Sequence, residues 1–554
     1  ANTTGQSNVG VGQNALGANT TAYYNTAIGS GALLVNTTGT RNAALGYAAL
    51  DANTDANDNT GLGYQALSAN STGDNNTAVG SYALVTNTTA DNNTAVGYSA
   101  LLYNTTGTNN VAVGAYALDA ATTANGNSAV GYAALGAATT GNYNVAMGYQ
   151  ALLTNVDGDR NVAIGASALQ TLDPSSNVDM YNVAVGHSAG LALTTGIKNT
   201  FIGGESGDAT TTADANTAVG YGSLGANITG TSNTAVGAYA LDATDDGYNN
   251  AAVGAYALSA NCGHSNVAMG YFALVANTAD NNTGIGTSAL AANTTGADNT
   301  AVGSSALLDA TTGARNTALG ASAGANLTTG DDNTALGRAA LFTATTISDT
   351  VAVGKNALYS MTTGAGNTAV GYEAGTTLTT AANTTAIGYE ALTALTTGNN
   401  NTAVGKEAAE ATTTGADNTA IGKGALGANT TASNNTALGS SALAANTTGT
   451  RNVAVGATAL DAATTANDNI AMGYQALGAL TTGSYNTSIG SYSGDDITTG
   501  ASNTVVGYAA LASVTTAAGN TAIGSSSLTT NTGASNTAVG INTLLVNSSG
   551  TNNV

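Results

Sequence analysis

The residue types that most often carry out chemistry are few and scattered in this chain of 554 residues. His187 and His264 are its two histidines, and neither has an acidic or nucleophilic residue at a repeating offset. Cys262 is its one cysteine, so no internal disulfide can form, and with His264 it supplies two of the four ligands that a structural zinc site needs. We therefore predict no catalytic residue, no metal site and no cofactor, and a protein that is not an enzyme.

Three acidic doublets are the remaining candidates for metal ligation. None lies in the Gly-rich nonapeptide pattern of calcium-binding β-rolls, so the expected role of these carboxylates is to solvate turns. The doublets are Asp245–Asp246, Asp331–Asp332 and Asp495–Asp496.

All of these residues belong to one 17-residue unit that repeats about 32 times. Its consensus is N-T-A-V-G-Y-x-A-L-x-x-N-T-T-G-x-x, numbered here as positions 1 to 17, and its first Asn recurs at Asn8, Asn25 and Asn42. A short fixed period indicates units that bury their apolar faces only against their neighbours. Gly and Asn recur too often for a long helix, and T-A-V-G-Y alternates at period two. The sequence predicts an all-β fold, a parallel β-solenoid of about 32 stacked coils that forms a rod.

Within each coil we expect two short strands, at T-A-V-G-Y and at A-L-x-x-N, joined by the T-T-G turn. Position 4 is always Val, Ile, Leu or Met, and position 9 is Leu in 26 repeats. We expect these two columns of apolar residues to form the core. Position 5 is Gly in every whole repeat, which indicates either a positive φ or a close backbone approach.

Position 12 is expected to face the same interior as position 9. In four coils where position 9 is Gly, position 12 is Leu or Ile, while the coil of Gly207 has Thr210 there instead. Such compensation of volume indicates a shared core. The usual Asn at position 12 is then buried, and identical amides one rung apart can bond to each other as a ladder. The predicted ladder includes Asn19, Asn36, Asn53, Asn87 and Asn104.

Tyrosine is the main aromatic residue, with 24 copies against 3 Phe and no Trp. Many tyrosines lie at position 6, where neighbouring rungs would stack their rings on the outside of the coil. Ladder packing is the simplest role for these rings, and contact with a glycan or a partner subunit is the alternative. The candidate surface-contact residues are Tyr47, Tyr64, Tyr132, Tyr149, Tyr372 and Tyr389.

Threonine pairs at positions 13 and 14, such as Thr20–Thr21 and Thr37–Thr38, raise the alternative of an ice-binding surface. Alternate residues of a strand share one face, whereas adjacent residues in a turn point in different directions. We therefore place ice binding behind the other functions.

The balance of charge excludes two classes of partner. The chain has 9 basic and 31 acidic residues, a net charge of −22, so it cannot neutralise a phosphate backbone, and we exclude nucleic acid. No run of 18 apolar residues occurs, so we expect no membrane insertion. Scarce lysine and a single cysteine are typical of an extracellular rod.

The array from residue 1 to 554 is expected to be continuous, with one insertion. Asn161 and Asn182 are 21 residues apart, so four extra residues enter around 170–179, and they include Pro174, the only proline. We expect this insertion to bulge from the rod because proline is excluded from interior strands. No capping segment is evident at either end, so exposed rungs are expected to favour end-to-end stacking.

The motif N-V-A-I-G at 161–165, with its N-T-A-V-G variants, resembles the head repeats of trimeric autotransporter adhesins of the YadA type. The longer unit at 59–67, 144–152 and 469–477 is similar to repeat arrays in phage and viral tail-fibre proteins. This resemblance implies a left-handed parallel β-roll that is trimeric in the adhesin family and reaches out to a surface.

These observations predict a non-enzymatic structural or adhesive fibre that forms a rigid rod outside the cell, at the cell surface or on a virion. The expected partners are other copies of the chain, as a lateral trimer or an end-to-end stack, and a cell-surface glycan or protein receptor. The alternative is a self-assembling extracellular filament or surface-layer subunit that polymerises through uncapped ends, and an ice-binding protein is less favoured.

Overall fold

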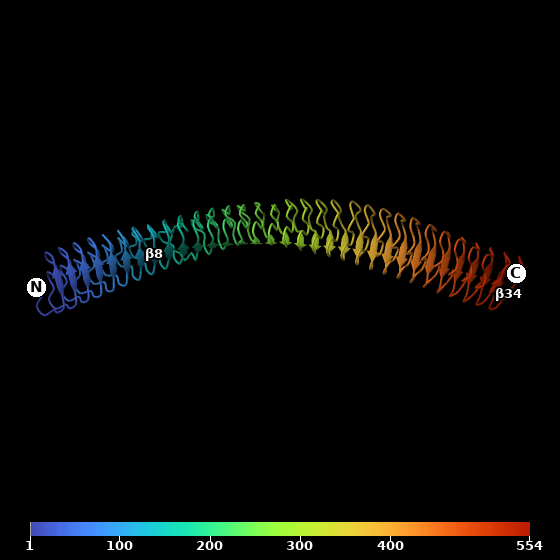
Figure 1. Cartoon of the computed structure of the whole chain (residues 1–554), viewed down its shortest axis with the longest axis horizontal. Coiled ribbons are helices and arrows are strands. Elements are labelled where there is room, and N and C mark those ends of the chain that lie inside the picture. Colours follow the sequence, from blue (N-terminus) through green and yellow to red (C-terminus); the bar gives the residue numbers. More distant parts are fainter. Residues whose placement is uncertain (1) are drawn as a thin grey trace. The chain divides into compact units, whose positions relative to one another are not determined.

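The computed structural model describes residues 2–554, and these form a parallel β-solenoid of stacked coils, about 17 residues each, as the sequence predicts (Figure 1). Each coil contributes one strand to a parallel sheet. Among the described residues, no helix is long and apolar enough to cross a membrane.

The chain divides into two compact units, of which the first ends at Asp280 and the second is Asn281–Val554. The strands of the first unit are β1 (Val9–Val11), β2 (Thr26–Ile28), β3 (Ala43–Leu45), β4 (Thr60–Leu62), β5 (Thr77–Val79), β6 (Thr94–Val96), β7 (Val111–Val113), β8 (Ser128–Val130), β9 (Val145–Met147), β10 (Val162–Ile164), β11 (Val183–Val185), β12 (Thr200–Ile202), β13 (Thr217–Val219), β14 (Thr234–Val236), β15 (Ala251–Val253) and β16 (Val267–Met269). Those of the second unit are β17 (Thr283–Ile285), β18 (Thr300–Val302), β19 (Thr317–Leu319), β20 (Thr334–Leu336), β21 (Val351–Val353), β22 (Thr368–Val370), β23 (Thr385–Ile387), β24 (Thr402–Val404), β25 (Thr419–Ile421), β26 (Thr436–Leu438), β27 (Val453–Val455), β28 (Ile470–Met472), β29 (Thr487–Ile489), β30 (Thr504–Val506), β31 (Thr521–Ile523), β32 (Thr530–Asn531), β33 (Thr537–Val539) and β34 (Val546–Asn547).

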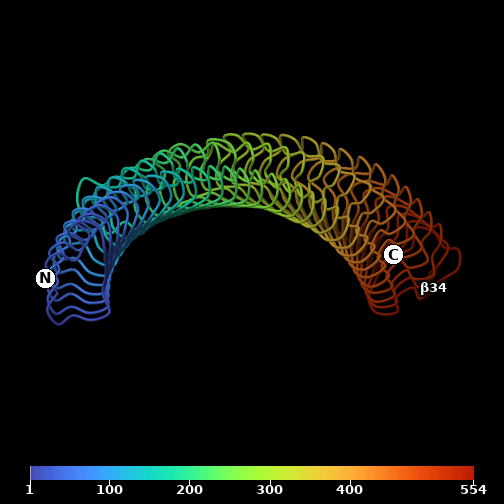
Figure 2. The same cartoon turned by 60° about the vertical axis from the view of Figure 1, so that its left-hand side comes forward.

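Within each unit the strands pair in register, so each repeat position meets the same position of the next coil. Between β2 and β3, for example, Thr26 pairs with Ala43, Ala27 with Ala44 and Ile28 with Leu45. Successive coils of a unit therefore lie directly behind one another (Figure 2). Side chains of one column form a row along each unit, at the spacing of about 4.8 Å between neighbouring strands.

The strands bury position 3 and present positions 2 and 4 to the outside. In β2, Ala27 is fully buried, whereas Thr26 and Ile28 are exposed. The prediction that position 4 belongs to the core is wrong, because a three-residue strand alternates its faces and only its middle residue points inward. The interior holds the small Ala of position 3 together with position 8, with Leu at position 9 and with position 12.

The prediction of a second strand over positions 8–12 is also wrong, except in the last two whole coils. There the two-residue strands β32 and β34 pair with each other. This segment forms turns because residues at positions 7 and 9 are left-handed, with φ of 48° at Ala48 and 55° at Leu50. A left-handed conformation costs a non-glycine residue about 1–2 kcal/mol. Full burial of Leu contributes roughly 1.5–3 kcal/mol, so burial offsets the backbone cost.

The Gly column at position 5 combines both features that the sequence indicates. Gly29 has a φ of 137°, and a Cβ atom built on it would lie 2.2 Å from the carbonyl oxygen of Gly46 in the next coil. No larger residue fits against a backbone that close, so this column fixes the corner at which each strand ends.

Positions 9 and 12 do share one interior. Leu193, Leu378 and Ile497, at position 12 of Gly-containing coils, are fully buried, and a Cβ built on Gly494 would lie 3.0 Å from Cδ1 of Ile497. In the coil of Gly207, a different residue fills the space that Leu occupies elsewhere. Phe201, at position 3, is fully buried between Gly190 and Gly207. A Cβ on either glycine would approach the Phe201 ring within 2.8 Å or less.

The insertion between Asn161 and Asn182 is partly packed against the coil. Ser175–Asp179 are exposed, but Leu172, Pro174 and Met180 on either side are buried. Pro174 lies near Gly158, so the proline itself packs inward while the five residues after it protrude.

We predict that Phe201→Ala lowers the free energy of unfolding by about 3–5 kcal/mol, because the flanking glycines provide no side chain to fill the cavity. Phe342→Ala is the matched control, since Phe342 is half-buried and stacks on Tyr359 at the surface, with ring centroids 5.1 Å apart. Hydrogen exchange of the coils around 182–223 should report the loss as local opening. Equal losses for the two variants would contradict this packing.

Candidate functional site

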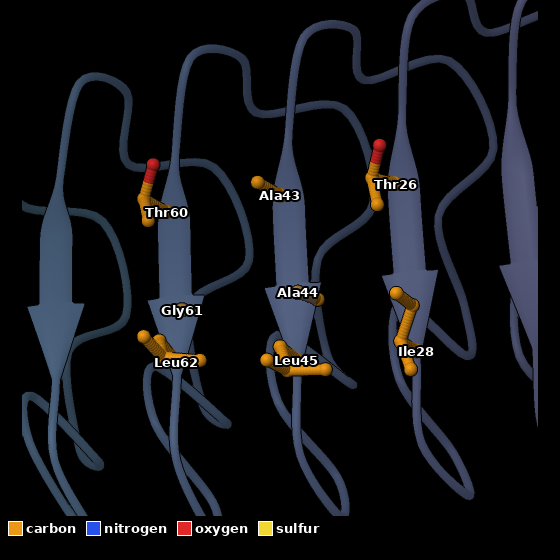
Figure 3. Close-up of a pocket in the computed structure, with 8 residues that line it drawn as sticks. All are labelled: Thr26, Ile28, Ala43, Ala44, Leu45, Thr60, Gly61 and Leu62. Atoms are coloured by element: carbon orange, nitrogen blue, oxygen red, sulfur yellow. The ribbon is translucent and has the colours of Figure 1, made fainter.

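The outward face of the strands is a uniform surface that recurs from coil to coil. It has one row of Thr or other small and β-branched residues at position 2, and one row of Val, Ile, Leu or Met at position 4. Figure 3 shows both rows on β2, β3 and β4, with Ile28, Leu45 and Leu62 aligned along one edge. Between 36% and 64% of many position-4 side chains is exposed, and no strand carries a charged residue at positions 2 or 4. We call these two rows the strand face.

The strand face has a hollow of about 250 Å³ in the first unit. It forms where position 2 is the small Ala43 between Thr26 and Thr60 (Figure 3). Ile28, Leu45 and Leu62 line it. The hollow has the size and apolar lining to take a large aliphatic side chain.

The Thr columns differ in the freedom of their hydroxyl groups. At position 13, Thr37 Oγ1 donates to the carbonyl oxygen of Thr54 at 3.1 Å, and Thr105 Oγ1 does the same to Thr122 at 3.0 Å. These hydroxyls are therefore committed to the inter-coil ladder. Threonines at position 2 instead stand in line on the strand face, where Thr60, Thr77 and Thr94 follow one another in register.

The asparagines of position 12 form an amide ladder inside the coil. Asn53 Nδ2 donates to Asn36 Oδ1 at 2.8 Å and to the carbonyl of Ala56 at 3.1 Å. Asn19, Asn36, Asn53, Asn87 and Asn104 are all buried, and each of the last four donates to the Asn one coil before it. The ladder stops at Ala121, and Asn104 Oδ1 is left as a buried acceptor without a partner.

Tyrosines of positions 6 and 7 form ladders on the outside, and their geometry follows a simple rule. Two tyrosines at the same position stack face to face, as in Tyr47–Tyr64 with centroids 5.3 Å apart and planes at 13°. Tyrosines at different positions meet edge to face, as in Tyr64–Tyr82 at 74°. The longest ladder runs over seven consecutive coils from Tyr47 to Tyr149.

The six tyrosines named as surface candidates all lie in such ladders with their side chains substantially exposed. Tyr47, Tyr64, Tyr132 and Tyr149 belong to the long ladder, and Tyr372 and Tyr389 form a stacked pair at 11° in the second unit. Lys355 and Lys406 lie over these two rings, with Nζ 5.1 Å from the Tyr372 centroid and 5.5 Å from the Tyr389 centroid. Neighbouring side chains thus cover the ring faces of this pair and leave its edges to solvent.

Several arginines meet a carboxylate of the next coil. Arg41, Arg315 and Arg451, all at position 17, each form a two-pronged pair with the Asp at position 17 of the next coil, over distances of 2.5–2.9 Å. The hydrogen bonds from these guanidinium groups hold the pKa of Asp58, Asp332 and Asp468 below its usual range. Arg160 pairs with Asp179 of the insertion and lies 5.7 Å from the ring centroids of both Tyr143 and Tyr181.

A second set of carboxylates is half-buried, and burial raises the pKa of each despite hydrogen bonds to most of them from nearby backbone amides. These residues are all at position 10, and no two of them occupy consecutive coils. They are Asp51, Asp119, Asp208, Asp242, Asp461 and Asp495.

The residues that suggested metal chemistry do not converge. Cys262 is buried with Sγ 3.2 Å from Thr244 Oγ1, and burial raises the pKa of its thiol to about 11. His264 lies outside and stacks on Tyr248, with centroids 3.8 Å apart. Sequence reasoning missed one acidic group, Glu390, Glu407 and Glu410, because its members come from two successive coils. Lys406 Nζ lies 3.0 Å from Glu407, which balances part of that charge.

No protein-family model matches this chain, and no curated protein matches it in sequence. The inferences below therefore rest on the residues and their geometry.

We predict that Asn53→Ala lowers the free energy of unfolding by about 1–3 kcal/mol, because it removes two donors and leaves Asn36 Oδ1 buried without a partner. Asn177→Ala is the control, since Asn177 is exposed and lies in the insertion, outside the position-12 ladder. Chemical denaturation measures both variants, and an Asn53→Ala loss no greater than that of Asn177→Ala would show that the ladder contributes no stability of its own.

We also predict that the protein becomes more stable as the pH falls from about 7 toward 4. A carboxylate whose pKa is raised in the folded state binds more protons folded than unfolded, so unfolding becomes less favourable as pH falls through the folded pKa. The Arg-paired aspartates act in the opposite sense only below their unfolded pKa of about 3.9. Denaturant unfolding at several pH values measures this slope, and Asp51→Asn with Asp242→Asn should flatten it. A curve that falls between pH 7 and 4 would contradict the assignment.

Proposed function

We propose that this protein is a non-enzymatic structural fibre component whose copies associate side by side through the strand face. The observation that carries this proposal is the strand face itself, with an uninterrupted aliphatic row at position 4 beside an uncharged row of Thr and other small or β-branched residues at position 2 along each unit. Soluble monomers rarely expose contiguous apolar patches larger than a few hundred Å².

The exposed aliphatic area supplies part of a stable contact. At about 25 cal/mol per Å², the ~1.5–3 kcal/mol of a buried aliphatic side chain corresponds to roughly 60–120 Å². Ile28, Leu45 and Leu62 expose 38%, 45% and 39% of their surface. At a similar exposure, the ten exposed position-4 side chains of the first unit leave roughly 240–480 Å² of area, against about 800 Å² per partner in a stable interface. The other six position-4 side chains are half-buried and add a smaller area. Threonine methyl groups add to that area.

The distribution of charge favours another copy of the chain as the partner. The net charge of −22 resists general association, but all of it lies away from positions 2 and 4. Two copies that meet face to face through the strand face bury no charge, and the polar groups that they desolvate are mainly the Thr hydroxyls of position 2. The hollow at Ala43 can accommodate an aliphatic side chain of the second copy.

We assign the adhesive part of the function to the tyrosine ladders. Their exposed ring edges and hydroxyls offer hydrogen bonds to a cell-surface glycan or protein receptor at a fixed rung spacing. The resemblance of N-V-A-I-G at 161–165 to autotransporter adhesin heads and tail-fibre arrays supports a place outside the cell, at its surface or on a virion.

One observation favours a second candidate function, the binding of ice. Threonines at position 2 and aliphatic residues at position 4 place hydroxyl and methyl groups on one side of a regular parallel sheet, which is the alternate-residue arrangement that a surface for ordered water requires. This use of the strand face competes with self-association. A thermal-hysteresis measurement separates them, since a laterally associated fibre would have no such activity.

We predict that the triple change Ile28→Asp, Leu45→Asp and Leu62→Asp weakens lateral association, because it buries three carboxylates in the contact. Thr21→Asp, Thr38→Asp and Thr72→Asp add the same charge at exposed turn positions and should leave association intact. Sedimentation equilibrium measures the mass, and electron microscopy of the same samples gives the width. A monomeric wild-type chain, or equal effects of the two triple variants, would refute association through the strand face.

A further inference from the structure

We propose that the face-to-face tyrosine pairs are sites of oxidative cross-linking, at which a one-electron oxidant joins the rings of adjacent coils as dityrosine. The four pairs with nearly parallel rings are Tyr47–Tyr64, Tyr132–Tyr149, Tyr239–Tyr256 and Tyr372–Tyr389, with centroids 5.2–5.5 Å apart and planes at 11–14°. This inference does not depend on lateral association.

The reaction balances with hydrogen peroxide and a haem peroxidase as the oxidant. Each phenol loses one electron and its hydroxyl proton, and the two electrons and two protons reduce one peroxide to two waters. The two phenoxyl radicals then couple between ring carbons ortho to the oxygens. The hydrogen on each coupled carbon moves to its oxygen as a proton, which restores both phenols, so the product has two hydrogens fewer than the two tyrosines.

The repeat geometry selects which tyrosines couple. Two rings at the same repeat position leave the backbone one rung apart in the same direction, so their ortho carbons face each other at the same height. Rings at positions 6 and 7 cross at 74–87°, which directs an edge of one ring at the face of the other. Because a held neighbour has a far higher effective concentration than a second chain, coupling stays within the chain in dilute solution.

The accessible side chains favour reaction at the tyrosines. About half of the Tyr47, Tyr64, Tyr132 and Tyr149 surface is exposed, the chain has no Trp, and Cys262 is only 2% exposed. The Tyr372–Tyr389 pair should react last, because Lys355 and Lys406 over the rings oppose the loss of an electron. The exposed methionines Met147, Met269 and Met472 react by gaining oxygen, which mass spectrometry distinguishes from the loss of two hydrogens.

The test treats the full chain, at micromolar concentration, with peroxidase and limiting hydrogen peroxide, followed by digestion and mass spectrometry. We expect linked peptides that join Tyr47 to Tyr64 and Tyr132 to Tyr149, with a mass two hydrogens below the sum. Tyr64→Phe keeps a ring in the stack but removes the phenol, and it should abolish the link to Tyr47.

Tyr82→Phe is the matched control, because it removes a phenol whose ring meets its neighbours edge to face, and both stacked links should remain. Links between edge-to-face pairs as abundant as those between stacked pairs would overturn the proposal. Links that form only between chains, or an unchanged yield of the Tyr47 link in Tyr64→Phe, would also overturn it.

Discussion

In-register stacking is the constraint on which the rest of this structure depends: every side chain has a copy of its own column about 4.8 Å above and below it. A residue type can recur along a column only if two identical side chains can pack at that distance. Asparagine does, because its amide both donates and accepts, as Asn53 does between Asn36 and Asn70. Tyrosine does, because rings stack.

Charged side chains are the least compatible with in-register stacking, because each would lie next to a like charge. Like charges about 4 Å apart repel by roughly 1 kcal/mol in water and by about 4 kcal/mol near a protein surface. The half-buried aspartates at position 10 are accordingly never in consecutive coils, and Asp208 and Asp242 have Gly225 between them. Each position-17 arginine with an Asp directly after it in the column pairs with that Asp. Like charges do follow one another in a column at Asp74 and Asp91, and at Asp332 and Asp349. They also do so at Glu373, Glu390 and Glu407, where Lys406 lies against Glu407.

The fold class, the period and the shared interior of positions 9 and 12 could be predicted from the sequence, because the repeats supply a comparison within one chain. The outward direction of the position-4 side chains could not be predicted from the sequence. A column of Val, Ile, Leu and Met is what a core would show, and the same column results when another molecule covers it. The turns at positions 8–12 were missed for a different reason: Leu gives no local signal of a left-handed conformation, and only its burial accounts for it.

The position-4 column, which we predicted to lie in the core, connects the narrow core with the proposed assembly. Each coil encloses so little space that Ala fills position 3, and a Phe enters only at residue 201, where Gly190 and Gly207 make room. The larger aliphatic residues of position 4 have no room inside, yet the column never becomes polar in any strand of either unit. A surface that needed only solubility would gain from charge there. An uncharged aliphatic row on an otherwise acidic chain therefore supports the proposal that a second copy covers this face.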